Sequence, residues 1–262
     1  MFARSEFGSP HLASSPRASV CMATYNGAEF IRAQLASILE QLQPDDEVVI
    51  VDDHSSDDTV AIVRALHDPR IVVLHNDQNL GYVRSFARAM TVARGDVLLL
   101  SDQDDIWAPG RRDALVSATE SGGVVASNLA LLESGEPLPS PISGRPWLLR
   151  RETGNQRLRN QLRILAGNAP YYGCAMAIHR NALKFVLPLP AYLTESHDLW
   201  IATVANHARA LRHLDRVTVL RRVHENNAST PKPRSVRQAL RSRLLLIRLW
   251  IEAVRRARRT LV

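Results

Sequence analysis

Cysteine is scarce in this sequence of 262 residues, and no apolar run is long enough to cross a membrane. Its two cysteines, Cys21 and Cys174, lie far apart, each in an apolar, strand-like stretch. Two such residues exclude a disulfide framework and a cysteine-ligated metal, and they predict buried thiols in a reducing compartment. The longest apolar stretch, residues 244–251, is interrupted by Arg248 and is far shorter than the roughly 18 residues of a spanning helix. The sequence therefore predicts a cytoplasmic protein.

The first 17 residues do not show the charged and then apolar pattern of a secretion signal. They are polar and rich in serine and proline, and residues 6–9 (E-F-G-S) are typical of a vector-derived sequence. We expect residues 1–17 to form a flexible leader outside the fold.

The formal net charge of +7 comes from one end of the chain. Residues 232–262 contain ten basic residues and one acid, whereas residues 1–231 contain 23 basic and 25 acidic residues. The main part of the chain is therefore slightly acidic, and it lacks the aromatic and basic platform that binds single-stranded nucleic acid. This distribution argues against a nucleic-acid partner and assigns the basicity to a C-terminal segment.

Apolar residues make up 45% of the sequence and charged residues 23%, which suffices for a core and excludes general disorder. Between residues 19 and 126, short β-branched runs alternate with segments whose apolar residues recur at helical spacing. Such alternation predicts right-handed crossovers and a mostly parallel, Rossmann-like α/β sheet with helices on both faces. We expect strands at residues 19–23, 47–51, 71–75 and 96–100, and helices at residues 29–42, 57–66 and 82–93.

The pattern changes after residue 126. Four prolines and a glycine between residues 137 and 146 predict a surface loop. Beyond it we expect helices at residues 156–165 and 199–207, and strands at residues 173–178 and 217–223. Two prolines flanking Lys232 then separate this region from a helix at residues 235–261.

Polar residues follow three of the four predicted parallel strands, at the sheet edge where α/β proteins bind ligands. They lie at residues 24–27 (T-Y-N-G), 52–57 (D-D-H-S-S-D) and 101–105 (S-D-Q-D-D). Two carboxylate clusters at one edge are typical of a cation site that faces a phosphorylated ligand. Turn and helix-capping roles are the alternative for Asp52 and Asp53, whereas three acids among residues 102–105 would repel one another without a cation or solvent.

Several short motifs follow one another along the chain. They are V-C-M-A-T-Y-N-G at 20–27, V-D-D-x-S-x-D-x-T at 51–59, N-L-G and R-S-F at 79–81 and 84–86, S-D-Q-D-D-I-W at 101–107, H-D at 197–198, and R-V-H at 222–224. Each motif is weak alone, but their shared order and spacing are specific. Together they resemble the motifs of the family 2 glycosyltransferases with the GT-A fold, over about residues 18–228. Within that family the sequence looks most like bacterial enzymes that add rhamnose or related sugars to polysaccharides and lipid-linked glycans.

The resemblance implies a GT-A domain over residues 18–230, with a donor half at about 18–126 and an acceptor half at about 127–230. It implies inverting, metal-dependent transfer of a sugar from a nucleoside-diphosphate sugar, with dTDP-rhamnose or a UDP-sugar favoured. The acceptor would be a glycan or lipid-linked glycan of cell-surface polysaccharide synthesis. The sequence lacks the Q-x-x-R-W element of the family's processive synthases, which favours addition of one or a few sugars.

Carried over by position, the resemblance assigns the sugar-nucleotide site to the strand ends. Asp102 would face the ribose or sugar, and Asp104 would bind Mg²⁺ or Mn²⁺ that bridges the diphosphate. Arg222 would face the diphosphate and His224 would complete the metal shell, although a late His beside an Arg is also typical of a protein surface. The other nucleotide-binding candidates are Ala23, Thr24, Asn26, Asp52, Asp53, Asn79 and Arg84.

On the acceptor side, Asp198 matches the acid that serves as general base in the family. The sequence departs from the family pattern at the preceding position, where His197 stands in place of the usual Glu. Two alternatives stay open. In the first, Glu195 is the counterpart of the family's Glu, displaced by two positions. In the second, Ser196 and Asp198 only cap the helix predicted to begin near residue 199. Tyr171 and Tyr172 precede the strand predicted below the acceptor, either as sugar-stacking residues or as an ordinary strand edge.

The predicted C-terminal helix, within residues 231–262, is basic and amphipathic. Such a helix suits the surface of an anionic membrane, which predicts a peripheral protein at the inner face of the cytoplasmic membrane. Packing on the domain, or against a second subunit in a homodimer, is the alternative. The arginine stripe comprises Arg237, Arg241, Arg248, Arg255 and Arg259, and the apolar face comprises Val236, Leu240, Leu244, Ile247, Ile251 and Val254.

Other functions fit the sequence less well. A receiver-like or phosphatase-like domain needs a lysine after a late strand, and Lys184 lies in a helical context. A sugar-phosphate nucleotidyltransferase needs a glycine-rich, basic loop after the first strand, which residues 24–27 do not provide. A non-catalytic module that binds nucleotide sugars stays open as a third alternative.

Overall fold

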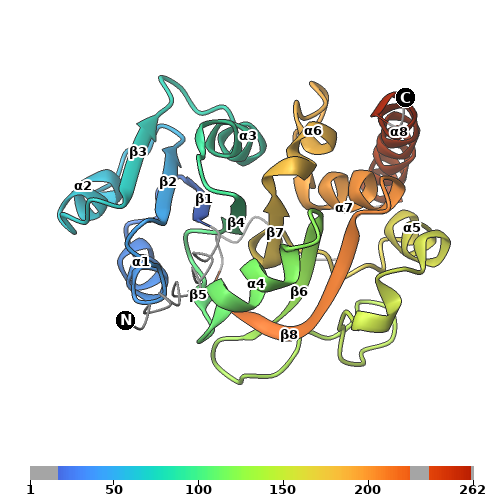
Figure 1. Ribbon diagram of the computed structural model, residues 1–262, viewed down its shortest axis with the longest axis horizontal. Helices are drawn as coiled ribbons and strands as arrows, with labels where there is room; N and C mark the ends of the chain where they lie inside the picture. The colour runs from blue at the N-terminus through green and yellow to red at the C-terminus, as the bar shows by residue number, and fades with distance from the viewer. Residues whose placement is uncertain (1–16, 225–235, 261–262) are drawn as a thin grey trace, which may run out of the picture.

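A computed structural model describes residues 17–224 and 236–260 and shows eight strands in one curled sheet (Figure 1). The strand order is β3-β2-β1-β4-β7-β6-β8-β5. The first four strands pair in parallel, β7 is antiparallel to both β4 and β6, β8 is parallel to β6, and β5 is antiparallel to β8. The strands are β1 (Ala18–Thr24), β2 (Glu47–Asp52), β3 (Ile71–His75), β4 (Val97–Ser101), β5 (Ile106–Trp107), β6 (Val124–Leu131), β7 (Met176–His179) and β8 (Leu211–Arg221).

Helices cover both faces of the sheet, as the sequence predicts. Successive strand residues point to opposite faces, so Val49 and Val51 of β2 pack in the core beneath α3 and α7. Val48 and Ile50 of the same strand pack in a second core beneath α1, α2 and α4. The helices are α1 (Ile31–Leu39), α2 (Thr59–Arg64), α3 (Tyr82–Val92), α4 (Arg111–Thr119), α5 (Arg157–Ala166), α6 (Leu183–Val186), α7 (His197–His207) and α8 (Val236–Thr260).

The parallel half of the sheet, β1 to β4, lies where the sequence predicts it, and the α/β fold class is confirmed. The second half differs from prediction in two strands. The predicted strand at residues 173–178 begins with a 3-10 turn, η2 (Gly173–Ala175), so that β7 is shorter. The predicted strand at residues 217–223 is the end of the longer β8, whose first residues include Arg212, His213 and Asp215 and therefore show no apolar run. The strands β5 and β6 and the helices α4 and α6 were not predicted.

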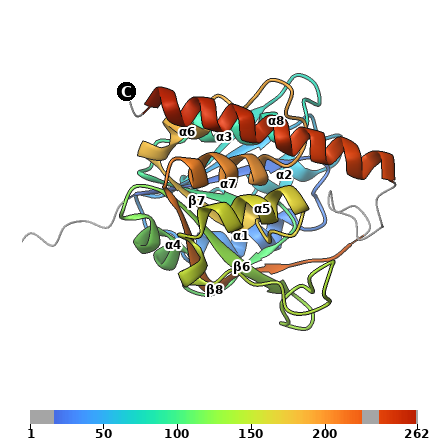
Figure 2. The ribbon, with the colours of Figure 1, turned by 90° about the vertical axis from the view of Figure 1, so that its right-hand side faces the viewer.

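The C-terminal helix α8 packs along α7 and also contacts α5 and α6 (Figure 2). Its buried side chains are Leu246, Leu249, Ala253 and Ala257. These residues differ from the apolar face predicted from sequence, because Leu240, Leu244, Ile247 and Ile251 are exposed. The helix therefore packs on the domain and keeps a second apolar strip facing outward.

Some sequence predictions fall outside the described residues. They concern residues 1–16 of the expected leader, the prolines around Lys232, and the side chains of Val236 and Arg259. Among the described helices, even α8 lacks the uninterrupted apolar length that a bilayer-spanning helix needs.

Candidate active site

The loops after β1 and β2 are joined by side-chain hydrogen bonds. Thr24, at the end of β1, donates from Oγ1 to Oδ1 of Asp52 at 3.2 Å. Asn26 donates its backbone amide to Ser55 Oγ at 3.0 Å and accepts at Oδ1 from the amide of Ser56 at 2.8 Å. Asp52 also accepts from the amide of Ser55 at 3.1 Å, so it orders the turn after its own strand. The loop that follows Ala23 and Thr24 is therefore held by hydrogen bonds at the carboxyl edge of the sheet, where α/β proteins bind ligands.

The next residue, Asp53, fixes the loop that precedes α3. Its carboxylate accepts from Asn76 Nδ2 at 2.7 Å and from the backbone amides of Leu80 and Gly81 at 2.9 and 2.8 Å. Gly81 has a φ of +85°, a left-handed conformation that favours glycine. Asn79 lies in the same loop and accepts at Oδ1 from the Gly81 amide at 3.2 Å. Asp53 therefore holds in place the loop that contains Asn79, a predicted nucleotide-binding residue.

A glutamine links the β1 loop to the acidic loop after β4. Gln103 accepts at Oε1 from the amide of Tyr25 at 2.9 Å and donates from Nε2 to the Tyr25 carbonyl at 3.1 Å. A Cβ at Gly27 would lie 2.3 Å from Gln103 Oε1, so the glycine allows the two loops to meet. The middle residue of the D-Q-D triplet is thus a bridge between strand ends.

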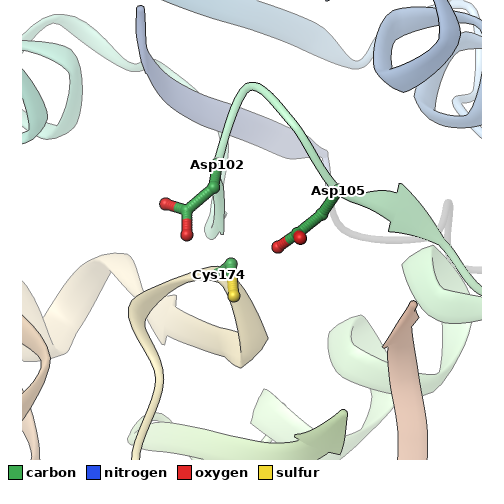
Figure 3. Close-up of side chains that lie close together, drawn as sticks. All are labelled: Asp102, Asp105 and Cys174. Carbon is green, nitrogen blue, oxygen red and sulfur yellow. The ribbon is translucent and has the colours of Figure 1, made fainter. Parts of the chain in front are cut away.

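Asp102 and Asp105 converge with Cys174, a residue of η2, at the end of β4 (Figure 3). Each of the three offers a ligand atom, and these atoms all lie within 4.8 Å of one another. Burial, and then the charges of the neighbouring carboxylates, raise the pKa of Asp102 to about 8 and that of Asp105 to about 6. Carboxyls crowded in this way gain most from a cation, which would favour their ionised forms.

A fully buried arginine connects the segments that carry Asp102, Asp105 and Cys174. Arg111 of α4 donates from Nη2 to the carbonyls of Leu100 and Cys174 at 2.9 and 2.6 Å. Burial lowers the pKa of the guanidinium to about 10, while the charges of Asp105 and Asp102 favour its protonated form. Arg111 therefore joins the end of β4 to η2 and supplies a positive charge beneath the acids.

The predicted pair of metal ligands is in contact. His224 Nε2 lies 2.8 Å from Asp104 Oδ2, and the imidazole packs on Phe30 with ring centroids 4.5 Å apart. The two residues are 120 positions apart in sequence, and the fold brings them together where β8 ends beside the acidic loop. This geometry favours the ligand interpretation of His224 over that of an ordinary surface residue.

These side chains fit a hard divalent cation. Mg²⁺ and Mn²⁺ take carboxylate oxygens readily, and an imidazole nitrogen suits Mn²⁺ as well. Asp104 and His224 would hold the ion, with Asp102 and Asp105 close by in the same loop. Burial raises the pKa of Cys174 well above its usual value, so its thiol stays protonated and is a poor ligand.

Two consecutive arginines close the site at the end of β8, and they point in different directions. Arg222 donates its amide to Asp105 Oδ1 at 3.1 Å and Nε to the Asp104 carbonyl at 3.2 Å, with its guanidinium over Phe30. Arg221 lies instead over the ring of Tyr172, 5.6 Å from its centroid. Its charge lowers the pKa of both Asp102 and Asp198. The motif match pointed to Arg222 as the arginine facing the diphosphate and did not include Arg221. Because side chains alternate along a strand, Arg221 points to the opposite side from Arg222.

The predicted base lies in the first turn of α7. Asp198 Oδ1 accepts from the amide of Leu199 at 2.8 Å, and the amide of Gly173 forms a further hydrogen bond with it. Burial raises the pKa of Asp198 to about 6, although these amide bonds and Arg221 act in the opposite direction. Ser196 makes no capping hydrogen bond through its side chain. Hydrogen bonds therefore hold the carboxylate in place, and its pKa lies close to neutral pH.

The histidine that stands in place of the family's glutamate packs against aromatic side chains. His197 stacks on Phe86 with ring centroids 4.6 Å apart and meets Tyr82 edge-on at 5.6 Å. Within the described residues neither ring nitrogen has a hydrogen-bond partner, and burial lowers the pKa to about 4. A Cβ at Gly173 would lie 2.7 Å from His197 Nε2, so this glycine makes room for the ring. His197 is therefore neutral at pH 7 and does not reproduce a carboxylate.

Aromatic residues line the site beside Arg221. Tyr172 meets Trp147 edge-on with ring centroids 6.0 Å apart, and it also contacts Arg221. Tyr171 is buried instead, and its hydroxyl lies 2.9 Å from Nε2 of His213. Of the two tyrosines, only Tyr172 faces the site, and its neighbour Trp147 was not predicted. Arg84 of α3 lies farther out and donates to the Ala191 carbonyl at 3.2 Å.

Comparison with known proteins decides the family. The model of the family described as "Glycosyl transferase family 2" matches residues 19–187, which include the strand ends and the acidic loop. The chain belongs to glycosyltransferase family 2. Membership favours sugar transfer over the nucleotidyltransferase and phosphatase-like alternatives, and it confirms the resemblance read from the motifs.

Several curated relatives of this glycosyltransferase are named for polysaccharide biosynthesis or for sugar transfer. The putative colanic acid biosynthesis glycosyl transferase WcaA of Escherichia coli K12 is 35% identical over 37% of this chain and 36% of its own length. The E. coli protein WfgD, named as a UDP-Glc:α-D-GlcNAc-diphosphoundecaprenol β-1,3-glucosyltransferase, is 25% identical over 72% of this chain and 70% of its own length. The matched regions span from 33% to 70% of the curated relatives' lengths.

A solved structure shares the fold. The structure of S. aureus TarS (residues 1–349) in complex with UDP-GlcNAc superposes with a TM-score of 0.64. The match covers 92% of this chain and 72% of that chain, at 20% sequence identity. The GT-A fold predicted from the motifs is confirmed by this match.

Proposed function

We propose that this glycosyltransferase is metal-dependent and inverting, and that it moves a sugar from a nucleoside-diphosphate sugar to a glycan or lipid-linked acceptor. The observation that carries the proposal is the contact of Asp104 with His224, beside Asp102 and Asp105 and within the field of Arg221. Of the two donors favoured by sequence, the names of WfgD and of the TarS complex support a UDP-sugar over dTDP-rhamnose.

The donor would lie along the carboxyl ends of β1, β2 and β4. Asp53 and Asn79 order the loop proposed to face the base, and Asn26 and Thr24 brace the adjoining loop. Asp104 and His224 would hold Mg²⁺ or Mn²⁺ at the diphosphate, with Arg221 and Arg222 as nearby cationic groups. A bound cation supplies positive charge that stabilises the departing nucleoside diphosphate.

Asp198 would remove the proton from the acceptor hydroxyl. A pKa of about 6 leaves most of this carboxylate ionised at pH 7, yet makes it a stronger base than an ordinary aspartate. Tyr82 contacts the His197 ring, and its pKa is raised by burial and then by the charges of Asp198, Glu195 and Asp102, which supports a base near the acidic loop. A single base implies one displacement with inversion, since a retaining route needs a second carboxylate as nucleophile.

The remaining assignments follow from this proposal. Residues 18–126 would bind the donor and residues 127–230 the acceptor, with residues 231–262 as a separate basic helix. The exposed strip of α8 supports an anionic membrane surface as a partner, which would place the protein at the inner face of the cytoplasmic membrane. Neither nucleic acid nor an obligatory second subunit enters the proposal.

The test is a panel of nucleotides followed by a transfer assay. UDP, dTDP and GDP, each with and without Mn²⁺, are added to the full chain, and the unfolding temperature is measured. We expect the proper nucleoside diphosphate with Mn²⁺ to raise it by about 5 °C or more, because ligand binds only the folded state. The matching sugar nucleotide should then give a product of inverted anomeric configuration. A retained configuration, or the same shift without Mn²⁺, would contradict the proposal.

A further inference from the structure

The outward strip of α8 is apolar on one side and basic on the other. Leu240, Leu244, Ile247 and Ile251 are 61%, 59%, 44% and 47% exposed. Arg237, Arg241 and Arg255 are also exposed on this helix. The opposite side of α8 already packs on α7 through Leu249 and Ala253, so the strip is not needed for the core.

Helix α5 carries a second exposed apolar strip. Leu158 is 73% exposed and Leu162 is 56% exposed, and Ala166 completes the same face one turn later. The buried side of α5, which includes Asn160 and Ile164, faces the domain. The hollow along this outward face has a volume of about 690 Å³ and is lined by α5 residues that include Leu158 and Leu162.

The two strips meet where the helices touch. Arg243 of α8 donates from Nη2 to the carbonyl of Ala166, the last residue of α5, at 2.8 Å. Leu240 and Ile247 lie three residues before and four after Arg243, so they share its side of α8. Figure 2 shows α5 and α8 running across the same face of the molecule. The apolar side chains of both helices thus belong to one surface, which we call the α5–α8 face.

The charges on the two helices of the α5–α8 face are almost all positive. Helix α5 contains three arginines and no acid, and α8 contains eight arginines and one acid, Glu252. That glutamate is paired with Arg256 of the same helix at 3.2 Å. Arg157 and Arg159 are exposed beside Leu158. Apolar side chains flanked by arginines suit the boundary between lipid headgroups and acyl chains.

We propose that the α5–α8 face docks on an anionic lipid bilayer, with both helices lying in its surface. A second copy of the chain fits less well, because a two-fold interface would bring two copies of the same positively charged surface together. The anionic headgroups of a bilayer complement them, and its acyl chains accept the leucines. The inference extends the membrane contact proposed for α8 to α5, and it is independent of sugar transfer because vesicle binding requires no catalysis.

The test is co-sedimentation of the full chain with vesicles of phosphatidylcholine that contain about one-third phosphatidylglycerol. The decisive variant is Leu158→Gln/Leu162→Gln, which changes α5 alone at exposed positions. We expect its partition coefficient to fall at least about tenfold, because two leucines lose their apolar contact with lipid. Leu240→Gln/Leu244→Gln should have a similar effect, and Arg237→Gln/Arg241→Gln should weaken binding about fivefold for each arginine removed. Wild-type binding should decrease with added salt and with neutral vesicles.

A matched control is Val92→Gln on α3, an apolar residue 43% exposed outside the α5–α8 face, which should bind like the wild type. Unfolding temperatures of all variants establish that they are folded. Wild-type binding by the α5 variant would overturn the two-helix proposal. Failure of the wild type to bind anionic vesicles would overturn it as well. A wild-type dimer without lipid that the α5 variant converts to a monomer would assign the face to self-association instead.

Discussion

The acidic loop after β4 and the start of α7 both hold carboxyls of raised pKa, but their surroundings differ. In the acidic loop, Asp105 is buried and Asp102 is half-buried, and the two carboxyls repel one another because their ligand oxygens lie within 4.8 Å. At the start of α7, burial raises the pKa of Asp198, whereas backbone hydrogen bonds and the charge of Arg221 oppose the shift. A bound cation lowers the repulsion between crowded carboxylates, whereas a single desolvated carboxylate becomes neutral by taking up a proton.

This difference matches the two catalytic needs of the proposed mechanism. The acidic loop belongs to the parallel half of the sheet, where strand ends meet, so several carboxylates reach one point. Asp198 lies in the first turn of α7, next to the neutral His197 ring, which stacks on Phe86 and meets Tyr82 edge-on. We infer that the acidic loop is suited to bind a cation that offsets the negative charge of the donor. Asp198 is suited to take the proton from the acceptor hydroxyl.

The largest effect is expected at the metal ligand. Asp104→Ala should lower transfer by about 10³ and remove the dependence of nucleotide binding on Mn²⁺, because a bound cation contributes several kcal/mol to stabilising the leaving group. Rates at saturating donor and nucleotide titrations with and without Mn²⁺ measure this. Asp58→Ala, an exposed acid before α2, is the matched control and should behave like the wild type. Unchanged Mn²⁺ dependence in Asp104→Ala would exclude it as a ligand.

The next effect concerns the base. Asp198→Asn keeps the shape of the side chain but cannot take a proton, so transfer should fall by about 10² or more. Donor and metal binding should stay near wild type, since Asp198 lies outside the acidic loop. Single-turnover rates and nucleotide affinity separate the two. Asp113→Asn, at an exposed acid of α4, controls for the loss of one charge. A variant that transfers at the wild-type rate would refute the assignment.

A smaller effect is expected for His224. His224→Ala removes one ligand and leaves Asp104 in place, so the Mn²⁺ concentration for half-maximal activity should rise by about tenfold. The unfolding temperature without metal should change little. Because His224 also packs on Phe30, His224→Gln is a second variant that keeps some of this contact. An unaltered Mn²⁺ requirement in both variants would return His224 to a surface role.

The smallest effect is a change of stability with pH in the metal-free protein. Asp102 has a folded pKa of about 8, above its usual 3.8, so the folded state binds the extra proton. Its contribution is complete below about pH 4 and is lost as the pH rises through 8. The unfolding temperature without metal should therefore fall between pH 6 and 8 more steeply in the wild type than in Asp102→Asn. Equal slopes in the two proteins would contradict the raised pKa.

Sequence analysis predicts the parallel half well for a physical reason. Its strands are short, buried on both faces and separated by regular helices, so apolar periodicity locates them directly. β8 was truncated in the prediction because its first part carries Arg212, His213 and Asp215 and pairs with β6 through an irregular register. The outward strip of α8 was taken for its packing face, because both sides of the helix are apolar.

The candidate site was predictable where motifs name its residues and unpredictable where distant segments meet. Asp104 and His224 were paired by motif, and the structure places them in contact. Arg111 and Cys174 had no such signal, since they reach the acidic loop from α4 and η2. Arg221 could have been found by applying strand alternation at the end of β8. The neutral state of His197 depends on Phe86 and Gly173, which no sequence spacing reveals.

The most direct test of this division is calorimetric titration of the cognate nucleoside diphosphate into Asp104→Asn and Asp198→Asn, each with and without Mn²⁺. Both variants replace one carboxylate by an amide of the same shape, so they differ only in which region loses its charge. We predict that Mn²⁺ strengthens binding to Asp198→Asn as it does to the wild type and has no effect on binding to Asp104→Asn. Equal loss of the Mn²⁺ effect in both variants, or its survival in Asp104→Asn, would contradict the account.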